Sequence, residues 1–311
     1  MNWILLAVGA QFLNAFVALV DKRIVSDEKT LPRPFVYAFY TCLISGAWII
    51  VYFIGFVPFM SEVLQVPTFS NVMKPTLEVV ALSFLSAYTF FTALVAMFSA
   101  LRDHDASDVV PVIGSVSALA SFGMGYYFFN TTLSHNFILG IALLSVGTFL
   151  VSHLRFPVKT AMVALYSGIF FALHYITLKG LFASTSFDNG FFWSRIAFVF
   201  FALTLLMIPN YFEKIKEQTK STTKGTAVLV LINKLLAGVS TILILKATDL
   251  GDVAVVQALG GLQFVFILVL GIFFSIRPSK LNIGETYQHD TILKKALFVA
   301  VITVGFLVLF R

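Results

Sequence analysis

Three ionisable side chains lie inside apolar stretches of this sequence: Lys234, His174 and Arg195. A charge at the centre of a lipid bilayer costs about 2.5–3.5 kcal/mol on insertion scales, so such residues are candidates for a functional site. Lys234 lies 11 residues before Leu245 and 7 after Ala227. At about 1.5 Å per residue it is roughly 10 Å inside its segment. An ammonium at this depth could bind an anion; alternatively, it pairs with backbone carbonyls or extends to one membrane face.

Two interpretations are open for each of the other two residues. His174 lies mid-segment and could carry a substrate proton or a coupling proton, or it could be a neutral, hydrogen-bonded packing residue. Arg195 lies about one turn inside its segment. This position favours an anchor at the membrane interface over a contact with substrate.

Uncharged polar residues form a second set of candidates. Gln11, Asn14, Ala18 and Asp21 follow one another at spacings of 3, 4 and 3, which places them on one helical face. We expect this polar stripe to face a cavity. Gln257, in a later segment, could contact substrate or bond a neighbouring carbonyl.

Carboxylates have a different distribution. No Asp or Glu lies in the middle of an apolar segment: Glu78, Asp108 and Asp252 stand at segment starts, and Asp21 follows the end of the first segment. The sequence therefore predicts an electropositive cavity in which Lys234 is the main charge and has no partner. Such a cavity disfavours export of lipophilic cations, which need an anionic counter-charge.

The composition explains where these residues must lie. Of 311 residues, 59% are hydrophobic and 12% charged, whereas soluble domains carry about 25% charged residues. Ten apolar segments are long enough to cross a bilayer as helices. They are roughly Trp3–Val20, Phe35–Val57, Leu77–Leu101, Asp108–Phe129, Phe137–Leu154, Ala161–Phe182, Phe191–Ile208, Ala227–Leu245, Gly251–Ile276 and Ile292–Phe310. The first lacks a basic start and a cleavage site, so we expect a retained helix and not a signal peptide.

One stretch of the sequence occurs twice. Ser99–Phe129 aligns on Leu243–Phe273 at a shift of 144 residues, with 7 identities in 31 positions. Each copy contains an apolar helix, a basic residue, an Asp-x-x-Asp connection and a second apolar helix. The halves 1–154 and 161–311 then hold five helices each, so the second crosses the membrane in the opposite sense. The predicted fold is an all-α integral membrane protein of ten transmembrane helices in two inverted five-helix repeats, a transporter architecture.

Lys and Arg are distributed unevenly between the connections. The odd-numbered connections hold 15 of them, and the even-numbered ones with the C-terminus hold 4. The positive-inside rule predicts that the odd connections are cytoplasmic and both termini external. We expect a multi-pass protein of the cell (inner) membrane. The net charge of +6 includes no long basic run, so nucleic acid is not an expected partner.

Several short motifs have familiar counterparts: Ala15-x6-Lys22, Ala172-x6-Lys179, Ala100-Leu101-Arg102 before Asp105–Pro111, Phe192–Arg195, and Gly140 with Gly147. In these the whole chain resembles the ten-helix EamA-like transporters of the drug/metabolite transporter superfamily. The resemblance implies secondary transport through a cavity between two halves, for amino acids, sugars, nucleotide derivatives or drugs. Such relatives are usually drawn with cytoplasmic termini, the opposite of the orientation predicted here.

Together these patterns predict a secondary transporter that moves a small polar metabolite, with an anionic group, by alternating access. The expected substrate-binding residues are Lys234, His174, Asn14, Gln11, Gln257 and Arg195. The expected partners are this small molecule, the lipid bilayer and a coupling proton, with no cofactor or metal. Alternatives are an exporter of neutral amino acids and a lipid-phosphate translocase. An enzyme is not expected, because the sequence has no His/Glu metal motif and no nucleophile elbow.

Overall fold

A computed structural model describes residues 2–27, 31, 33–54, 67–130, 134–152 and 157–276, together with 304, 305 and 308. Over these residues the chain is helical and has no strand, as expected where hydrocarbon offers backbone groups no partner. The elements are α1 (Asn2–Ser26), α2 (Pro34–Ala47), η1 (Trp48–Ile50), α3 (Val51–Ile54), η2 (Phe69–Asn71), α5 (Leu77–Asp103), α6 (Ala106–Phe129), α7 (His135–Ser152), α8 (Val158–Ser184), α9 (Phe187–Leu206), α10 (Pro209–Ser221), α11 (Lys224–Leu250), α12 (Val253–Ala258) and α13 (Gly261–Ile276).

Eight helical stretches are long and apolar enough to cross a membrane, which makes this an all-α, multi-pass membrane protein. They correspond to eight of the ten predicted segments. The fifth predicted segment corresponds to α7, a helix of 18 residues. The tenth, Ile292–Phe310, lies outside the described residues except for 304, 305 and 308.

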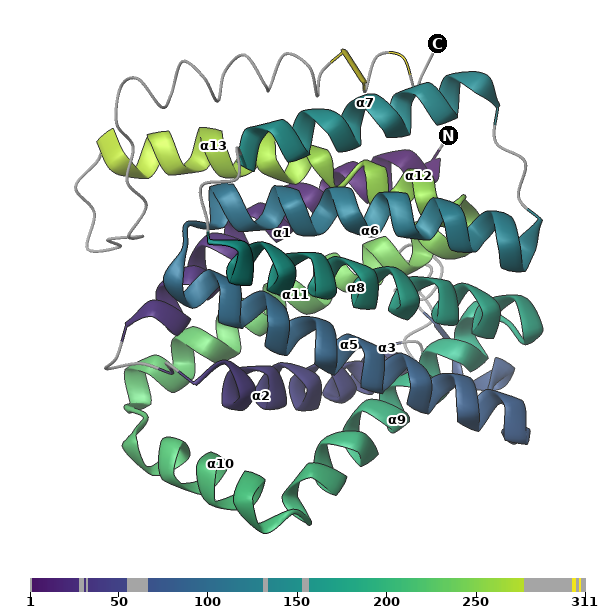
Figure 1. The fold of residues 1–311 in the computed structure, drawn as a ribbon. Coiled ribbons are helices and arrows are strands. Elements are labelled where there is room, and N and C mark those ends of the chain that lie inside the picture. Colours follow the sequence, from purple (N-terminus) through teal and green to yellow (C-terminus); the bar gives the residue numbers. More distant parts are fainter. Residues whose placement is uncertain are drawn as a thin grey trace.

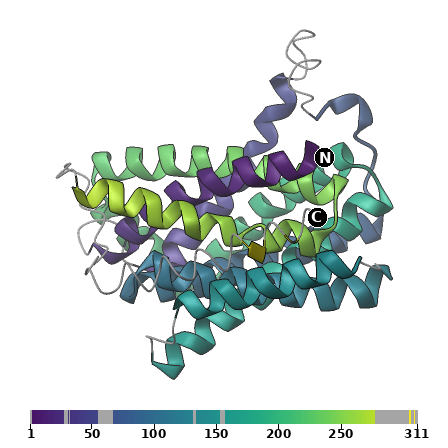
Figure 2. The ribbon, with the colours of Figure 1, turned by 90° about the horizontal axis from the view of Figure 1, so that it is seen from above.

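Two helix pairs make the most extensive contacts among the described elements. α1 packs along α11, and α5 packs along α8. α6 covers α8, and α7 lies on the outer side of α6 (Figure 1). Figure 2 shows α1 flanked by α11 and α13. α2 packs between α5 and α9.

The two copies of the repeated connection lie at opposite ends of α1. Near its start, the Trp3 ring packs against Gly251, so closely that a Cβ built on the glycine would be 2.7 Å from the ring. Near its end, Lys22 Nζ lies 3.4 Å from Arg102 O. The nineteen residues from Trp3 to Lys22 span about 28 Å of helix. The α5–α6 and α11–α12 connections therefore face opposite sides of the bundle (Figure 1).

α1 continues through six residues beyond its predicted end at Val20. The charges of Asp21 and Lys22 do not end the helix, because both side chains find partners inside the bundle. Asp21 Oδ1 lies 2.8 Å from Lys234 Nζ, and Lys22 Nζ donates to Arg102 O.

Two predicted segments are bent helices. The second is divided by the 3₁₀ turn η1, where the Trp48 indole packs on Gly238 of α11. A Cβ on Gly238 would be 1.7 Å from Trp48 Nε1, so only glycine fits there. The ninth is divided into α12 and α13 by a turn at residues 259–260, where Leu262 N bonds back to Leu259 O. Such short 3₁₀ stretches inside helices often mark hinges.

The predicted connection Asn210–Thr226 contains a helix of its own, α10. Pro209 supplies its first position, where a missing N–H costs nothing. The helix is polar and lies at the edge of the bundle between the ends of α9 and α11 (Figure 1).

Candidate functional site

A buried ion pair joins α1 to α11. Lys234 Nζ lies 2.8 Å from Asp21 Oδ1, and the two side chains are 3% and 4% exposed. Lys234 is the eleventh residue of α11, far from either end. Because both charges are removed from water, salt screens their attraction little, and loss of one partner leaves the other uncompensated.

Two further groups bind the same carboxylate. Tyr37 OH, from α2, and Asn233 Nδ2, at 2.6 Å, donate to Asp21 Oδ1. Lys234 Nζ also lies 4.3 Å from the centroid of the Tyr37 ring and 5.1 Å from that of Phe98, within range of cation–π attraction. We call these five residues, which come from four helices, the Asp21 cluster.

The prediction that Lys234 has no partner in an electropositive cavity is wrong. The reason is the extra length of α1, which carries Asp21 past Val20 to the depth of Lys234. The sequence did contain a signal, because the stripe that includes Gln11 and Asn14 puts Asp21 on the same helical face.

Arg195 is a second buried cation, and it has no ion pair with any described residue. Its side chain is 2% exposed. Nη1 donates to Ser45 O of α2 at 3.3 Å, while Nη2 has no hydrogen-bond partner in the described part of the chain. The guanidinium carbon lies 4.9 Å from the centroid of Phe191 and 4.4 Å from that of Phe198.

Arg195 lies deeper than the sequence predicted because α9 starts earlier. The helix begins at Phe187, where Ser186 Oγ accepts a hydrogen bond from Asn189 N and caps it. Arg195 is therefore the ninth helical residue, about 12 Å from the first. Protein encloses its side chain, which argues against the interpretation as an interface anchor.

His174, on α8, shares the Phe198 ring with Arg195. Its Nδ1 lies 3.0 Å from Ser86 O and 3.3 Å from Ser86 Oγ. Because a carbonyl oxygen only accepts, the first contact requires a proton on Nδ1. The ring centroid lies 4.8 Å from that of Phe90 and 6.0 Å from that of Phe198. This is the geometry of a hydrogen-bonded packing residue, one of the two interpretations; a role in proton transfer stays a prediction.

The three uncharged candidates lie on α1 and α12, at contacts with α11, α6 and the turn that follows α12. Asn14 Oδ1 lies 2.6 Å from Ser240 Oγ. Gln257 Oε1 accepts from Ser117 Oγ at 3.1 Å. Gln11 is 5% exposed. We call Gln11, Asn14 and Gln257 the amide residues.

The turn between α12 and α13 lies beside two of the amide residues, Gln11 and Asn14. A Cβ built on Gly260 would be 3.9 Å from Gln11 Nε2, so the glycine lies beside this amide. Gln263 Nε2, just after the turn, donates to Asn14 O at 3.1 Å. Broken helices with backbone near polar side chains are a feature of transporter binding sites.

The six predicted residues thus lie in three places and not in one cavity. α2 links two of these places, because Tyr37 belongs to the Asp21 cluster and Ser45 contacts Arg195, about 12 Å further along the helix. No group of three or more His, Cys, Asp or Glu that could hold a metal occurs among the residues described above.

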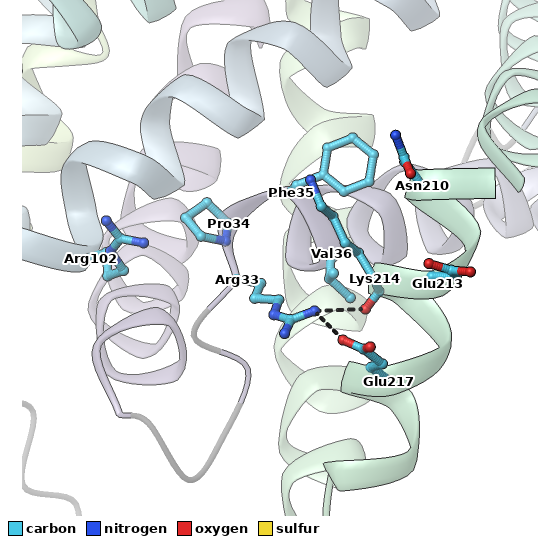
Figure 3. Close-up of a pocket in the computed structure, with 9 residues that line it drawn as sticks. All are labelled: Arg33, Pro34, Phe35, Val36, Arg102, Asn210, Glu213, Lys214 and Glu217. Carbon is cyan, nitrogen blue, oxygen red and sulfur yellow. Dashed lines mark hydrogen bonds and ion pairs between the residues drawn. The ribbon is translucent and has the colours of Figure 1, made fainter. Parts of the chain in front are cut away.

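Sequence reasoning missed a cavity of about 480 Å³ at the end of the bundle where α1 ends (Figure 3). Its charged lining residues are Arg33, Arg102, Lys214, Glu213 and Glu217. Arg33 Nη1 lies 3.0 Å from Glu217 Oε2 and 3.4 Å from Lys214 O. The available signal was the concentration of Lys and Arg in the odd connections, but nothing in it indicated that Arg33 meets a helix 184 residues away.

Comparison with known proteins identifies the fold and no more. The chain matches no protein-family model and no curated protein. In structure it matches 28 chains, among them one described only as "Crystal structure of protein". That likeness covers 99% of this chain and 96% of the other, with a TM-score of 0.65 and 14% sequence identity.

Proposed function

We propose that the protein is a secondary transporter, built from inverted repeats 1–154 and 161–311, that moves a small polar metabolite with an anionic group by alternating access. The observation that carries the proposal is the Asp21 cluster, an ion pair buried between membrane-length helices. A static bundle gains little from such a pair, because desolvation offsets the attraction and apolar residues can replace it. A charge pair between two halves suits a contact that forms in one state and breaks in another.

Two lysines support the inverted repeats. Lys22 Nζ donates to Arg102 O, at the end of α5. Lys179 Nζ donates to Thr248 O and Asp249 O, at 2.9 and 2.7 Å, at the end of α11. Each lysine therefore meets the carbonyl end of the helix before an Asp-x-x-Asp connection, a favourable place for a cation. The two connections face opposite sides of the bundle, which inverted repeats require.

We propose further that the chain is related to the EamA-like transporters. In the same proposal it lies in the inner membrane with the odd connections facing the cytoplasm. The cavity in Figure 3 agrees with this orientation, since Arg33, Arg102 and Lys214 all come from odd connections. A substrate leaving or entering the cytoplasm would then pass charged groups of both signs.

The same cavity favours a second candidate function, export of neutral amino acids. Its lining carries basic and acidic side chains together. A zwitterion has one group for each sign, whereas a simple anion would meet repulsion from Glu213 and Glu217.

Binding and flux on the purified protein test the proposal. A panel of carboxylates, phosphate esters and neutral amino acids is screened for thermal stabilisation, because a ligand at 100 times its Kd raises the unfolding free energy by about 2.7 kcal/mol. Compounds that stabilise are then assayed for uptake into liposomes, with and without a proton gradient. Uptake of an anion supports the main proposal, and stabilisation by neutral amino acids alone favours the second. Binding without uptake of any compound contradicts transport.

A matched variant sharpens the flux assay. Asp21→Asn/Lys234→Met removes both charges and keeps an acceptor for Tyr37 and Asn233. We expect it to fold and to lose uptake, because the contact proposed to alternate is gone. Normal uptake by this variant would assign the Asp21 cluster to packing alone.

A further inference from the structure

Lys234 and Arg195, the two most deeply buried cations of the described residues, differ in what neutralises them. Lys234 has Asp21 at 2.8 Å. Arg195, although 2% exposed, has no carboxylate within ion-pair distance in the described ranges. A buried guanidinium without a counter-charge is costly. Its cost is recovered in a complex in which a bound anion supplies the missing charge.

The hydrogen-bonding capacity of Arg195 points to the same partner. A guanidinium has five N–H donors in one plane. Nη1 bonds Ser45 O at 3.3 Å and Nε lies 3.5 Å from Ser194 Oγ, both long contacts. Nη2 bonds no described residue. Nη2, together with Nη1 once it is released from Ser45 O, can therefore form the parallel pair of N–H···O bonds that a carboxylate accepts.

The surroundings of Arg195 restrict the rest of the ligand. Phe191 and Phe198 lie against the guanidinium, at 4.9 and 4.4 Å. Phe90 and His174 extend the aromatic wall from Phe198. A second ionised group on the ligand would be buried here without a partner, at high cost. An apolar or aromatic body would instead replace one hydrophobic contact by another.

We infer that Arg195, and not Lys234, binds the substrate, and that the substrate is a monoanionic carboxylate with a small apolar body. This inference rests on the proposed transport function and names its substrate class. It assigns the two cations different tasks: Arg195 meets the ligand, and Lys234 holds α11 to α1 through Asp21.

The bend of the second helix supplies the route to Arg195. Ser45, whose carbonyl accepts from Nη1, lies just before the 3₁₀ turn η1. A Cβ on its neighbour Gly46 would be 2.5 Å from Val199 Cγ2, so the bend lies directly on α9. Movement of η1 away from α9 releases Nη1 and uncovers the guanidinium. The carboxylate then replaces Ser45 O.

Benzoate and benzamide are the probes, because they share a shape and differ in one charge. We expect benzoate, and not benzamide, to raise the melting temperature of the purified wild-type protein. Arg195→Gln should abolish this shift, and Arg195→Lys, which keeps the charge but not the paired donors, should weaken apparent affinity about tenfold or more. Arg23→Gln, which removes one positive charge at the end of α1, is the matched control and should keep the shift. An equal benzoate shift in Arg195→Gln, or a shift lost only in Lys234→Met, overturns the inference.

Cys42 provides a second measurement that needs no variant. It is the chain's one cysteine and it is buried. Its Sγ lies 3.7 Å from the backbone oxygen of Phe198, whose ring packs on Arg195. N-ethylmaleimide reaches it only when α2 and α9 separate, so the alkylation rate reports this opening. We expect bound benzoate to slow alkylation and benzamide to leave the rate unchanged. Equal rates with and without benzoate contradict a carboxylate site at Arg195.

Liposome uptake of benzoate separates this inference from the proposed function. Uptake that is equal in the wild-type protein and in Arg195→Gln refutes the inference and leaves transport standing. Arg195-dependent binding without uptake refutes transport and leaves the binding site standing.

Discussion

The α1–α11 and α5–α8 interfaces are packed alike but charged differently. Each is bridged by a serine hydroxyl that donates to a backbone carbonyl at 2.9 Å, Ser240 to Ala10 O and Ser167 to Ala93 O. Small residues of this kind let membrane helices approach closely. At the first interface, Asp21 neutralises Lys234. At the second, His174 bonds Ser86, while Arg195 of the adjacent α9 has no counter-charge among the described residues.

This difference separates two roles that the sequence alone had merged. Close packing is common to both interfaces, so it does not require the charges. The neutralised interface is complete in this state, whereas the other has a donor left for a ligand. We therefore treat the α1–α11 interface as the structural contact of the resting state, and the α5–α8 interface with the adjacent Arg195 as the ligand-binding side.

The largest expected effect comes from breaking the neutralised interface. Lys234→Met leaves Asp21 buried with no ammonium, which costs about 3–5 kcal/mol of unfolding free energy. Denaturant or thermal unfolding in detergent measures the change. A loss below about 1 kcal/mol would mean that Asp21 is protonated or solvated in the native protein.

Removing the charge of Arg195, on the ligand-binding side, should raise stability and not lower it. Arg195→Met removes an uncompensated charge and keeps most of the side-chain volume. The cation–π attraction that disappears with the guanidinium is worth about 0.5–2 kcal/mol, less than the desolvation cost that disappears with it. We expect stability to rise by about 1–2 kcal/mol in the same unfolding assay. A destabilisation comparable to that of Lys234→Met would show that Arg195 has a counter-charge after all.

Removing both charges of the pair should restore most of what the single change costs. In Asp21→Asn/Lys234→Met no charge is left buried, and the amide oxygen introduced at position 21 can still accept from Asn233. Stability should therefore come within about 1 kcal/mol of the wild type.

Together with Lys234→Met and the single variant Asp21→Asn this completes a double-mutant cycle. A double variant as unstable as Lys234→Met would show that the ammonium acts through its packing and not through Asp21.

The smallest effects test the shared packing. Ser240→Ala and Ser167→Ala each remove one hydrogen bond across an interface, worth about 0.6 kcal/mol on average in membrane proteins. We expect the two losses to agree within error, measured by the same unfolding assay. Unequal losses would show that the similar geometry hides different packing.

Hydrophobicity was sufficient to predict the membrane-length helices, and the errors at their ends have both local and long-range causes. Ser186 starts α9 early by accepting from Asn189 N, a contact readable from the sequence only in retrospect. α1 extends past Val20 because Asp21 pairs with Lys234 inside the bundle. The two residues are 213 positions apart, and no local pattern encodes such a pairing. The candidate site was predictable in its residue types and not in its partnerships.

The cavity of Figure 3 and the division into three places lie further from the sequence. Both depend on which helices meet, and a nearly uniform apolar composition carries little information on that. The polar stripe of α1 was an exception. It put Gln11 and Asn14 on one helical face by spacing alone, and that this face borders a cavity stays a prediction.

The positions of the tryptophans make the protein its own fluorescence reporter, and a one-sided one. There are three: Trp3 packs on Gly251, Trp48 packs on Gly238, and Trp193 Nε1 donates to Met73 O at 2.9 Å. Trp3 and Trp193 lie at the end of the bundle that carries the even-numbered connections, and Trp48 lies at the bend of the second helix. None of them lines the cavity of Figure 3. In a Trp48→Phe variant, intrinsic emission will therefore change when the even side opens and stay constant when the other side does, which gives the direction of each conformational step without a label.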